Sequence, residues 1–267
     1  MPYRIVFQDV DGCLNPESGE PFGVERGWQP SSDQIAMFTA LNRALEAAPV
    51  EHFVINTGRP WDLVQPIVAH FPSSKVRYIL MEHACVFFDR LENRYLDAAG
   101  IARQLGLRSL AHRYGLVGEM ADVMQWYDDA GQSWLEACFE GSLGRLNKVG
   151  NLSFPIPEDV DGDAMVAAIE GKMRDDLSPA LCDALTFSRS DHFVDILPGV
   201  DKLDGLELVC RFLDISQSDA VAVGDFLNDL SIFRRDRNGI VRLFGLRLFF
   251  RILSRLEVIE LRKFILL

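Results

Sequence analysis

Two carboxylates stand two residues apart near the start of the chain, in the segment Asp9-Val10-Asp11-Gly12. Alternate residues of an extended strand point the same way, so both side chains can approach one reacting centre if the strand ends after Asp9. One carboxylate can then act as a nucleophile and the other as a general acid, provided that their pKa values are pushed apart. Gly12 lets the chain turn away sharply. The alternative is an aspartate-rich turn without chemistry.

Groups that suit phosphate oxygens follow later in the chain. Thr57-Gly58-Arg59 offers a hydroxyl and backbone N–H groups, which can cradle an anion. Lys202 lies just before a predicted helix and can supply a positive charge. Each signal is weak alone, since an ordinary turn and a solvated lysine give the same pattern.

A third acidic segment is Gly224-Asp225-Phe226-Leu227-Asn228-Asp229. Two acids and an amide in a tight loop suit a hard cation such as Mg²⁺, which takes one or two carboxylates and keeps some water. A polar loop that caps the following helix is the alternative.

Short apolar runs lead into three of these segments. The runs are Ile5–Phe7, Phe53–Ile55 and Val221–Val223, and they precede Asp9, Thr57 and Gly224. Continuous apolar runs are typical of parallel strands that are buried on both faces. Ligands bind at the carboxyl ends of such strands, so the polar segments are expected to converge.

Helical patterns separate the runs. Ile35, Phe38, Leu41 and Leu45 recur at three- and four-residue spacing, which predicts a helix over 32–48 with Ser31 or Ser32 as its cap. A second helix is predicted over about 203–213. Strand–helix–strand order indicates an α/β fold with a doubly wound, Rossmann-like parallel sheet.

The middle of the chain has a different pattern, with hairpin-like strands and separate helical stretches. We therefore predict an inserted α+β cap domain over 83–197. The core domain is expected to be discontinuous, over 1–82 and 198–267.

Together, the DxDG, TGR, lysine and GDxxND segments resemble the core motifs of the haloacid dehalogenase superfamily of phosphohydrolases. The motifs span Asp9 to Asp229, and the insert between TGR and the lysine looks like that of the capped, Cof-type subfamily. The segment from His192 to Lys202 also looks like that subfamily's approach to its lysine.

The resemblance implies a role for each motif residue. Asp9 would be the nucleophile that carries the phosphoryl group, and Asp11 the general acid and base. Thr57, Gly58, Arg59 and Lys202 would hold the phosphate. Mg²⁺ would be bound by Asp9, the backbone carbonyl of Asp11 and Asp225, with Asp229 as a further metal residue. Asn228 would belong to the substrate-binding set, and Asn228 and Asp229 would orient the lysine or the waters of the metal.

Substrate choice is expected to lie in the cap. The candidate is Arg189, with His192, Lys148, Arg145 and Asn147 as further possibilities. Resemblance to capped relatives implies a sugar or polyol phosphate, which is an argument from fold-level analogy.

Other readings of the same residues remain open. A dehalogenase would not need Asp11, and a response-regulator receiver is far shorter and lacks the insert. A sugar phosphomutase on the same fold would use the same aspartyl-phosphate. A non-catalytic protein that binds a phosphorylated metabolite is the alternative outside enzymes.

Composition narrows the class of partner. The formal net charge of −12 argues against nucleic acid as a partner. The five scattered cysteines favour reduced, buried thiols. The N-terminus runs directly into an apolar strand and no long apolar run follows, so we expect a cytoplasmic protein without a signal peptide or transmembrane segment.

The tail over 234–267 departs from the family pattern, because it is dense in leucine, phenylalanine and arginine. Arg247, Arg251 and Arg255 recur at four and would share one helical face. A packed terminal helix, a membrane-surface helix, an altered reading frame and a contact in a homo-oligomer are the alternatives.

Overall fold

The computed structural model describes residues 3–11, 13–14, 29–72, 74–141, 143–190, 192–224 and 241–244. The chain forms two compact units. The first comprises Met1–Asp97 and Lys202–Leu267, and the second comprises Ala98–Asp201.

Within the described residues, the first unit contains one seven-stranded sheet with the order β10-β9-β1-β2-β3-β4-β5. The strands from β10 to β3 are parallel, whereas β4 and β5 are antiparallel. Their bounds are β1 Ile5–Gln8, β2 His52–Asn56, β3 Tyr78–Met81, β4 Val86–Asp89, β5 Arg94–Leu96, β9 Ala220–Gly224 and β10 Val241–Phe244. The predicted parallel α/β sheet is confirmed.

Two helices pack on one face of this sheet, α1 (Ser32–Ala47) and α2 (Trp61–Val68). Ser31 begins α1 with a capping box, in which its hydroxyl accepts from the Gln34 backbone and the Gln34 side chain accepts from the Ser31 N–H. Phe38, Leu41 and Leu45 are buried as predicted. Ile35 is 38% exposed and lies outside the hydrophobic cluster that covers this face of the sheet.

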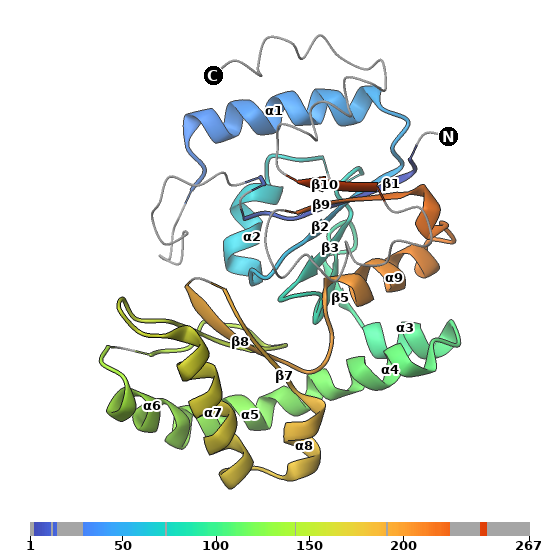
Figure 1. The fold of residues 1–267 in the computed structure, drawn as a ribbon. Coiled ribbons are helices and arrows are strands. Elements are labelled where there is room, and N and C mark those ends of the chain that lie inside the picture. The colour runs from blue at the N-terminus through green and yellow to red at the C-terminus, as the bar shows by residue number, and fades with distance from the viewer. Residues whose placement is uncertain are drawn as a thin grey trace. The chain divides into compact units, whose positions relative to one another are not determined.

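The helix α9 (Lys202–Phe212) lies on the opposite side of the sheet from α1 (Figure 1). Phe212 packs edge-on against Tyr78 and Phe87, with ring centroids 5.7 and 5.9 Å away. The 3-10 helix η3 (Gln217–Asp219) then leads into β9. Helices on both faces explain why the central strands β1 and β9 are buried along their whole length.

The hairpin of β4 and β5 corrects the expected start of the insert. Both strands fall within 83–197, yet they extend the core sheet, with Leu80 opposite Phe87 and Phe88 opposite Tyr95. The boundary between the compact units lies after Asp97. A hairpin has the same local pattern in either domain, so only its pairing with β3 decides where it belongs.

The second unit is built on a smaller sheet with the order β6-β8-β7. Its hydrophobic cluster joins one face of this sheet to α5, α7 and α8, and Figure 1 shows these helices on one side of the strands. The predicted hairpin around residue 190 is confirmed as β7 and β8. The bounds are α3 Ala98–Gln104, α4 Arg108–Gly115, η1 Leu116–Glu119, α5 Met120–Trp126, the π-helix η2 Tyr127–Gly131, α6 Gln132–Cys138, β6 Leu152–Pro155, α7 Gly162–Asp176, α8 Pro179–Ala184, β7 Thr186–Arg189 and β8 Phe193–Leu197.

The cysteines are all free thiols. Four are buried, namely Cys13, Cys85, Cys182 and Cys210, but Cys138 is exposed. The prediction of buried thiols is therefore wrong for Cys138, which ends α6 on the surface.

None of the helices in the described part of the chain has the length and hydropathy that crossing a membrane requires. The tail contributes β10, which pairs in parallel with β9. Arg247, Arg251 and Arg255 lie outside the described residues.

Candidate functional site

Three strands end side by side where the polar segments were predicted to meet. The central strand β1 pairs with β2 and β9, so that Gln8 stands opposite both Ile55 and Val223. Asp9 follows directly, and its backbone N–H donates to Val223 O at 2.9 Å. Thr57 follows β2, while Asp225, Asn228 and Asp229, which come after β9, lie outside the described residues.

Lys202 and Asp9 form a buried ion pair at this edge. The Nζ atom lies 2.7 Å from Asp9 Oδ2, and the side chains are 1% and 4% exposed. The other carboxylate oxygen of Asp9 accepts from the Val10 N–H at 2.7 Å. Removing two charges from water costs several kcal/mol per ion, so such a pair is weak evidence for stability. Charged pairs held at that cost are frequent at functional sites.

Arg59 and Asp11 form the second ion pair. The Arg59 Nε–H donates to Oδ1 of Asp11 at 2.9 Å and to Oδ2 at 3.2 Å, and Nη2 donates to Oδ1 as well. The guanidinium is 4% exposed, and the carboxylate is 37% exposed. The sequence predicted that Arg59 holds phosphate. In the structure its guanidinium orients the Asp11 carboxylate.

The Thr57 side chain is fully buried. Its hydroxyl oxygen accepts from the Arg59 backbone N–H at 3.2 Å. A hydroxyl that accepts one hydrogen bond retains its own proton, which it can donate to an anion. The arrangement is compatible with the predicted phosphate-binding role of Thr57-Gly58-Arg59.

Two amides at strand ends were missed by the sequence reasoning. The Gln8 side chain donates from Nε2 to Asp9 O at 2.9 Å, and Asn56 donates from Nδ2 to Lys202 O at 2.9 Å. Both side chains are 2% exposed. Each closes an apolar strand just before a predicted site residue, and that position was a usable signal.

The oxygen ligands at this edge of the sheet are of the type that a hard cation prefers. Asp9 and Asp11 present carboxylate oxygens, which Mg²⁺ prefers. Within the described ranges, no three His, Cys, Asp or Glu side chains gather as a metal site. The other acids predicted to hold the metal, Asp225 and Asp229, lie beyond these ranges.

The arginines predicted to select the substrate are ion-paired within the second unit. Arg189 donates to Asp163 at 2.6 and 2.9 Å, and Arg145 donates to Asp128 at 2.7 and 2.9 Å. In this arrangement both guanidinium groups already bind a carboxylate.

A buried polar cluster in the second unit, Lys148, Asn151, Ser153 and Asp195, was only partly foreseen. Lys148 Nζ and Asn151 Nδ2 each lie 3.3 Å from Asp195 Oδ1, and Ser153 stands opposite Asp195 in the register of β6 and β8. Asn151 Oδ1 and Ser153 Oγ are buried without a hydrogen-bond partner among the described residues. The alternate residues of these strands carry the hydrophobic cluster, so the polar groups occupy the other face of the sheet.

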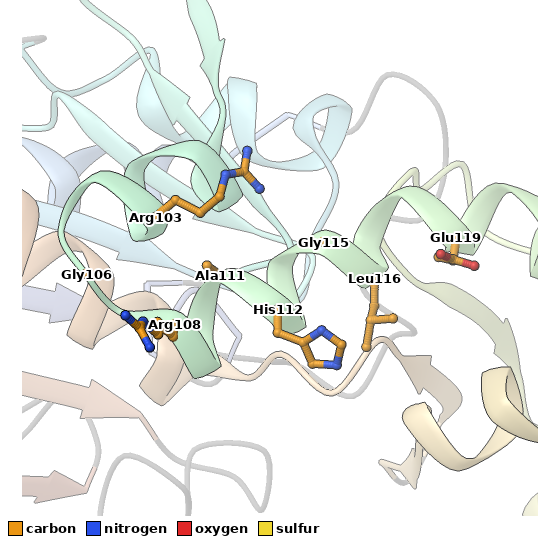
Figure 2. A pocket seen from close by; sticks show the side chains of 8 residues that line it. All are labelled: Arg103, Gly106, Arg108, Ala111, His112, Gly115, Leu116 and Glu119. Atoms are coloured by element: carbon orange, nitrogen blue, oxygen red, sulfur yellow. The ribbon is translucent and has the colours of Figure 1, made fainter.

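A separate pocket of about 790 Å³ lies along α3, α4 and η1 in the second unit. Figure 2 shows its cationic side chains pointing in different directions, with Arg103 away from His112. None of the described site residues predicted from the sequence lines this pocket. It therefore has no part in the candidate site.

Comparison with known proteins shows similarity to one family over part of the chain. A model of haloacid dehalogenase-like hydrolases matches residues 163–241. No curated protein matches the chain in sequence.

Solved structures share the fold at low sequence identity. Sucrose-phosphatase from Synechocystis sp., in complex with sucrose and phosphate, is 11% identical with a TM-score of 0.59, over 97% of this chain and 100% of that chain. A trehalose-6-phosphate phosphatase related protein is 16% identical with a TM-score of 0.55, over 97% and 99%. IMP-nucleotidase from Plasmodium falciparum is 12% identical with a TM-score of 0.58, over 99% of this chain and 63% of that chain. The chain is therefore similar to haloacid dehalogenase-like hydrolases in sequence over residues 163–241, and it shares the fold of solved phosphatases over most of its length.

Proposed function

We propose that the protein is a Mg²⁺-dependent phosphomonoesterase that acts on a sugar or polyol phosphate through an aspartyl-phosphate on Asp9. The observation that carries this proposal is the buried pair of Lys202 and Asp9 at the strand ends, next to the Thr57 loop. The lysine offsets the repulsion between an anionic nucleophile and an anionic phosphate, which is most of what phosphoryl transfer requires of a protein.

The proposed reaction has two steps. A carboxylate oxygen of Asp9 forms a bond to phosphorus while the bond to the leaving oxygen breaks, and Asp11 donates a proton to that oxygen. Water then attacks phosphorus and gives a proton to Asp11. The bond between phosphorus and the Asp9 oxygen breaks in this step, so phosphate is released and the Asp9 carboxylate is restored. Thr57 and Lys202 hold the phosphate oxygens throughout.

The Arg59–Asp11 pair adds a requirement to this scheme. A guanidinium has only donors, so it binds the carboxylate form of Asp11 and not a carboxylic acid proton. The arrangement of the structure therefore suits the step in which Asp11 accepts a proton from water. In the first step, protonated Asp11 would give up part of its contact with Arg59.

Mg²⁺ would be held by Asp9, the backbone carbonyl of Asp11 and Asp225, with Asp229 nearby, and it would neutralise charge on the phosphate oxygens. Nucleophilic attack and proton transfer are assigned to the side chains of Asp9 and Asp11.

The substrate class is proposed from the buried polar cluster. It contains one cation, one anion, an amide and a hydroxyl, which together offer donors and acceptors with balanced charge. Buried polar atoms without partners cost free energy. Hydroxyl groups of a sugar or polyol would supply partners to Asn151 and Ser153, so we propose that the unit acts as a specificity cap.

Phosphate release from a panel of phosphate esters tests the proposal. The panel contains sugar phosphates, polyol phosphates, IMP and p-nitrophenyl phosphate, each with Mg²⁺ or with EDTA, for wild type and Asp9→Asn. We expect Mg²⁺-dependent release from a sugar or polyol phosphate that vanishes in Asp9→Asn. Preferred release from IMP would reject the substrate class, and isomer interconversion without release would favour the mutase.

A cytoplasmic location also belongs to this proposal, because small phosphorylated metabolites are found there. Self-association through the tail is a further part of it. Sedimentation of the full chain and of a chain ending at 244 would test it, with loss of a dimer in the shorter chain as the expected result.

A further inference from the structure

The turn between β3 and β4 has an uncommon backbone conformation. Three consecutive non-glycine residues, Glu82, His83 and Ala84, have φ angles of 54°, 59° and 72°. The Cβ of an L-residue crowds the following carbonyl oxygen at such angles, so single residues adopt them far more readily than runs do. A strained run persists only where the surrounding structure holds it, and such runs cluster at functional sites.

Backbone hydrogen bonds join this turn to the Thr57 loop. The Glu82 N–H donates to Arg59 O at 3.2 Å, and the His83 N–H donates to Thr57 O at 3.0 Å. The Cys85 N–H closes the turn on Glu82 O at 3.2 Å. The turn therefore fixes the backbone on both sides of Gly58.

The His83 ring lies directly against Gly58. A Cβ atom at position 58 would meet Nε2 of His83 at 2.7 Å and Cε1 at 2.8 Å. Gly58 is not among the described glycines with left-handed φ, so its backbone conformation does not require glycine. The imidazole is what leaves no room for a side chain there.

The same turn contacts the helix that carries Lys202. A Cβ atom at Gly205 would lie 2.5 Å from Ala84 Cβ and 2.7 Å from Leu80 Cδ1. Glycine inside a helix is unfavourable relative to alanine. Here it allows α9 to approach the turn one helical turn after Lys202.

We propose that the turn Glu82–Cys85 is a wedge that sets the position of the Thr57 loop relative to Lys202, with His83 as its positioning residue. The inference rests on the proposed function, because it assigns both elements to one phosphate. Gly58 and Gly205 lie on separate elements, and each leaves room for a residue of this turn, His83 and Ala84 respectively. The turn therefore contacts both elements that are proposed to hold the phosphate, the Thr57 loop and the helix α9.

A double-mutant cycle of Gly58→Ala and His83→Ala tests the wedge. The readouts are kcat and KM for p-nitrophenyl phosphate, the inhibition constant of inorganic phosphate, and thermal melting by circular dichroism. In the wild-type background, Gly58→Ala should weaken phosphate binding roughly tenfold, because displacements near 1 Å have effects of this order or larger. In the His83→Ala background, Gly58→Ala should change the inhibition constant of phosphate by less than about twofold. If Gly58→Ala fails to fold, recovery of folding in the double variant reports the same coupling.

A second cycle pairs Gly205→Ala with Ala84→Gly. Gly205→Ala should again weaken phosphate binding less in the Ala84→Gly background than in the wild-type background. Gly171→Ala, where a Cβ would meet nothing within 4 Å, and exposed His112→Ala serve as controls that should leave the kinetic and inhibition constants unchanged. Gly171 lies inside α7, so its exchange for alanine should not lower the melting temperature. Equal losses from Gly58→Ala in both backgrounds, in an active wild type, would reject the wedge alone. A wild type that neither hydrolyses the ester nor binds phosphate would reject the proposed function and the wedge with it.

Discussion

Lys202 Nζ lies 2.7 Å from Asp9 Oδ2, and both side chains are buried although the residues come from distant parts of the chain. Lys202→Met leaves the Asp9 carboxylate without this cation. Breaking a buried pair from one side costs about 3–5 kcal/mol of unfolding free energy. We expect that loss in urea titrations, together with loss of phosphate release.

The double variant Asp9→Asn with Lys202→Met is the control for this prediction. It removes both charges, so it should recover most of the stability while remaining inactive. Equal stability of Lys202→Met and wild type would contradict a role for the ion pair in the folded protein.

Arg59 is expected to act through Asp11. Arg59→Lys replaces a two-pronged donor by a single ammonium group, which cannot hold the carboxylate in the same orientation. We predict a fall in kcat of about tenfold with little change in KM for p-nitrophenyl phosphate, since general acid–base catalysis contributes roughly 10²–10⁴-fold. Steady-state kinetics measure both constants.

Arg77→Lys is the matched control, because Arg77 binds Asp89 with the same two-pronged geometry at 2.7–3.0 Å. It should leave kcat unchanged. A rise in KM with unchanged kcat in Arg59→Lys would instead indicate direct contact with the phosphate, as the sequence suggested.

Changes in the buried polar cluster should alter KM for sugar phosphates but not KM for p-nitrophenyl phosphate. Asp195→Asn removes the charge that Lys148 and Asn151 face, so KM for the preferred sugar phosphate should rise about tenfold, since polar groups left unpaired cost about 1–3 kcal/mol. KM for p-nitrophenyl phosphate should not change. Glu170→Gln, on the exposed pair with Arg174, is the control.

Arg189→Ala tests the remaining sequence-based prediction for the cap in the same assay. A rise in KM for the sugar phosphate is expected if Arg189 binds substrate. An unchanged KM would limit Arg189 to its ion pair with Asp163.

His52 should make stability depend on pH. Burial lowers its pKa below the ordinary 6.5, and the nearby cation Arg4 lowers it further, whereas Glu51 opposes the shift. Below pH 6.5 the unfolded chain therefore binds more protons than the folded chain, so stability is present above that pH and falls on acidification. Urea midpoints between pH 8 and pH 5 should fall less in His52→Gln than in wild type.

His112→Gln controls for the loss of a histidine, because His112 is exposed. Its pH dependence should match that of wild type. Identical pH slopes in wild type and His52→Gln would show that other groups cause the acid sensitivity.

The sequence was sufficient for the parallel core and for the positions of Asp9 and Thr57. Strands buried on both faces are continuous apolar runs, and parallel strands put their carboxyl ends at one edge. The same reasoning misplaced β4 and β5 in the insert and expected Ile35 in the core. A local pattern shows which face of an element is apolar, but not which neighbour covers it.

The chemical groups and their order along the chain were determined by the sequence alone: two carboxylates, a hydroxyl loop, a lysine and a second acidic loop. Only the tertiary structure decided the partners, because contact depends on distances between segments that are far apart in the chain. It paired Arg59 with Asp11 and placed the His83 ring against Gly58. Periodicity and local spacing carry no information about such distances, whereas side-chain packing across the sheet does.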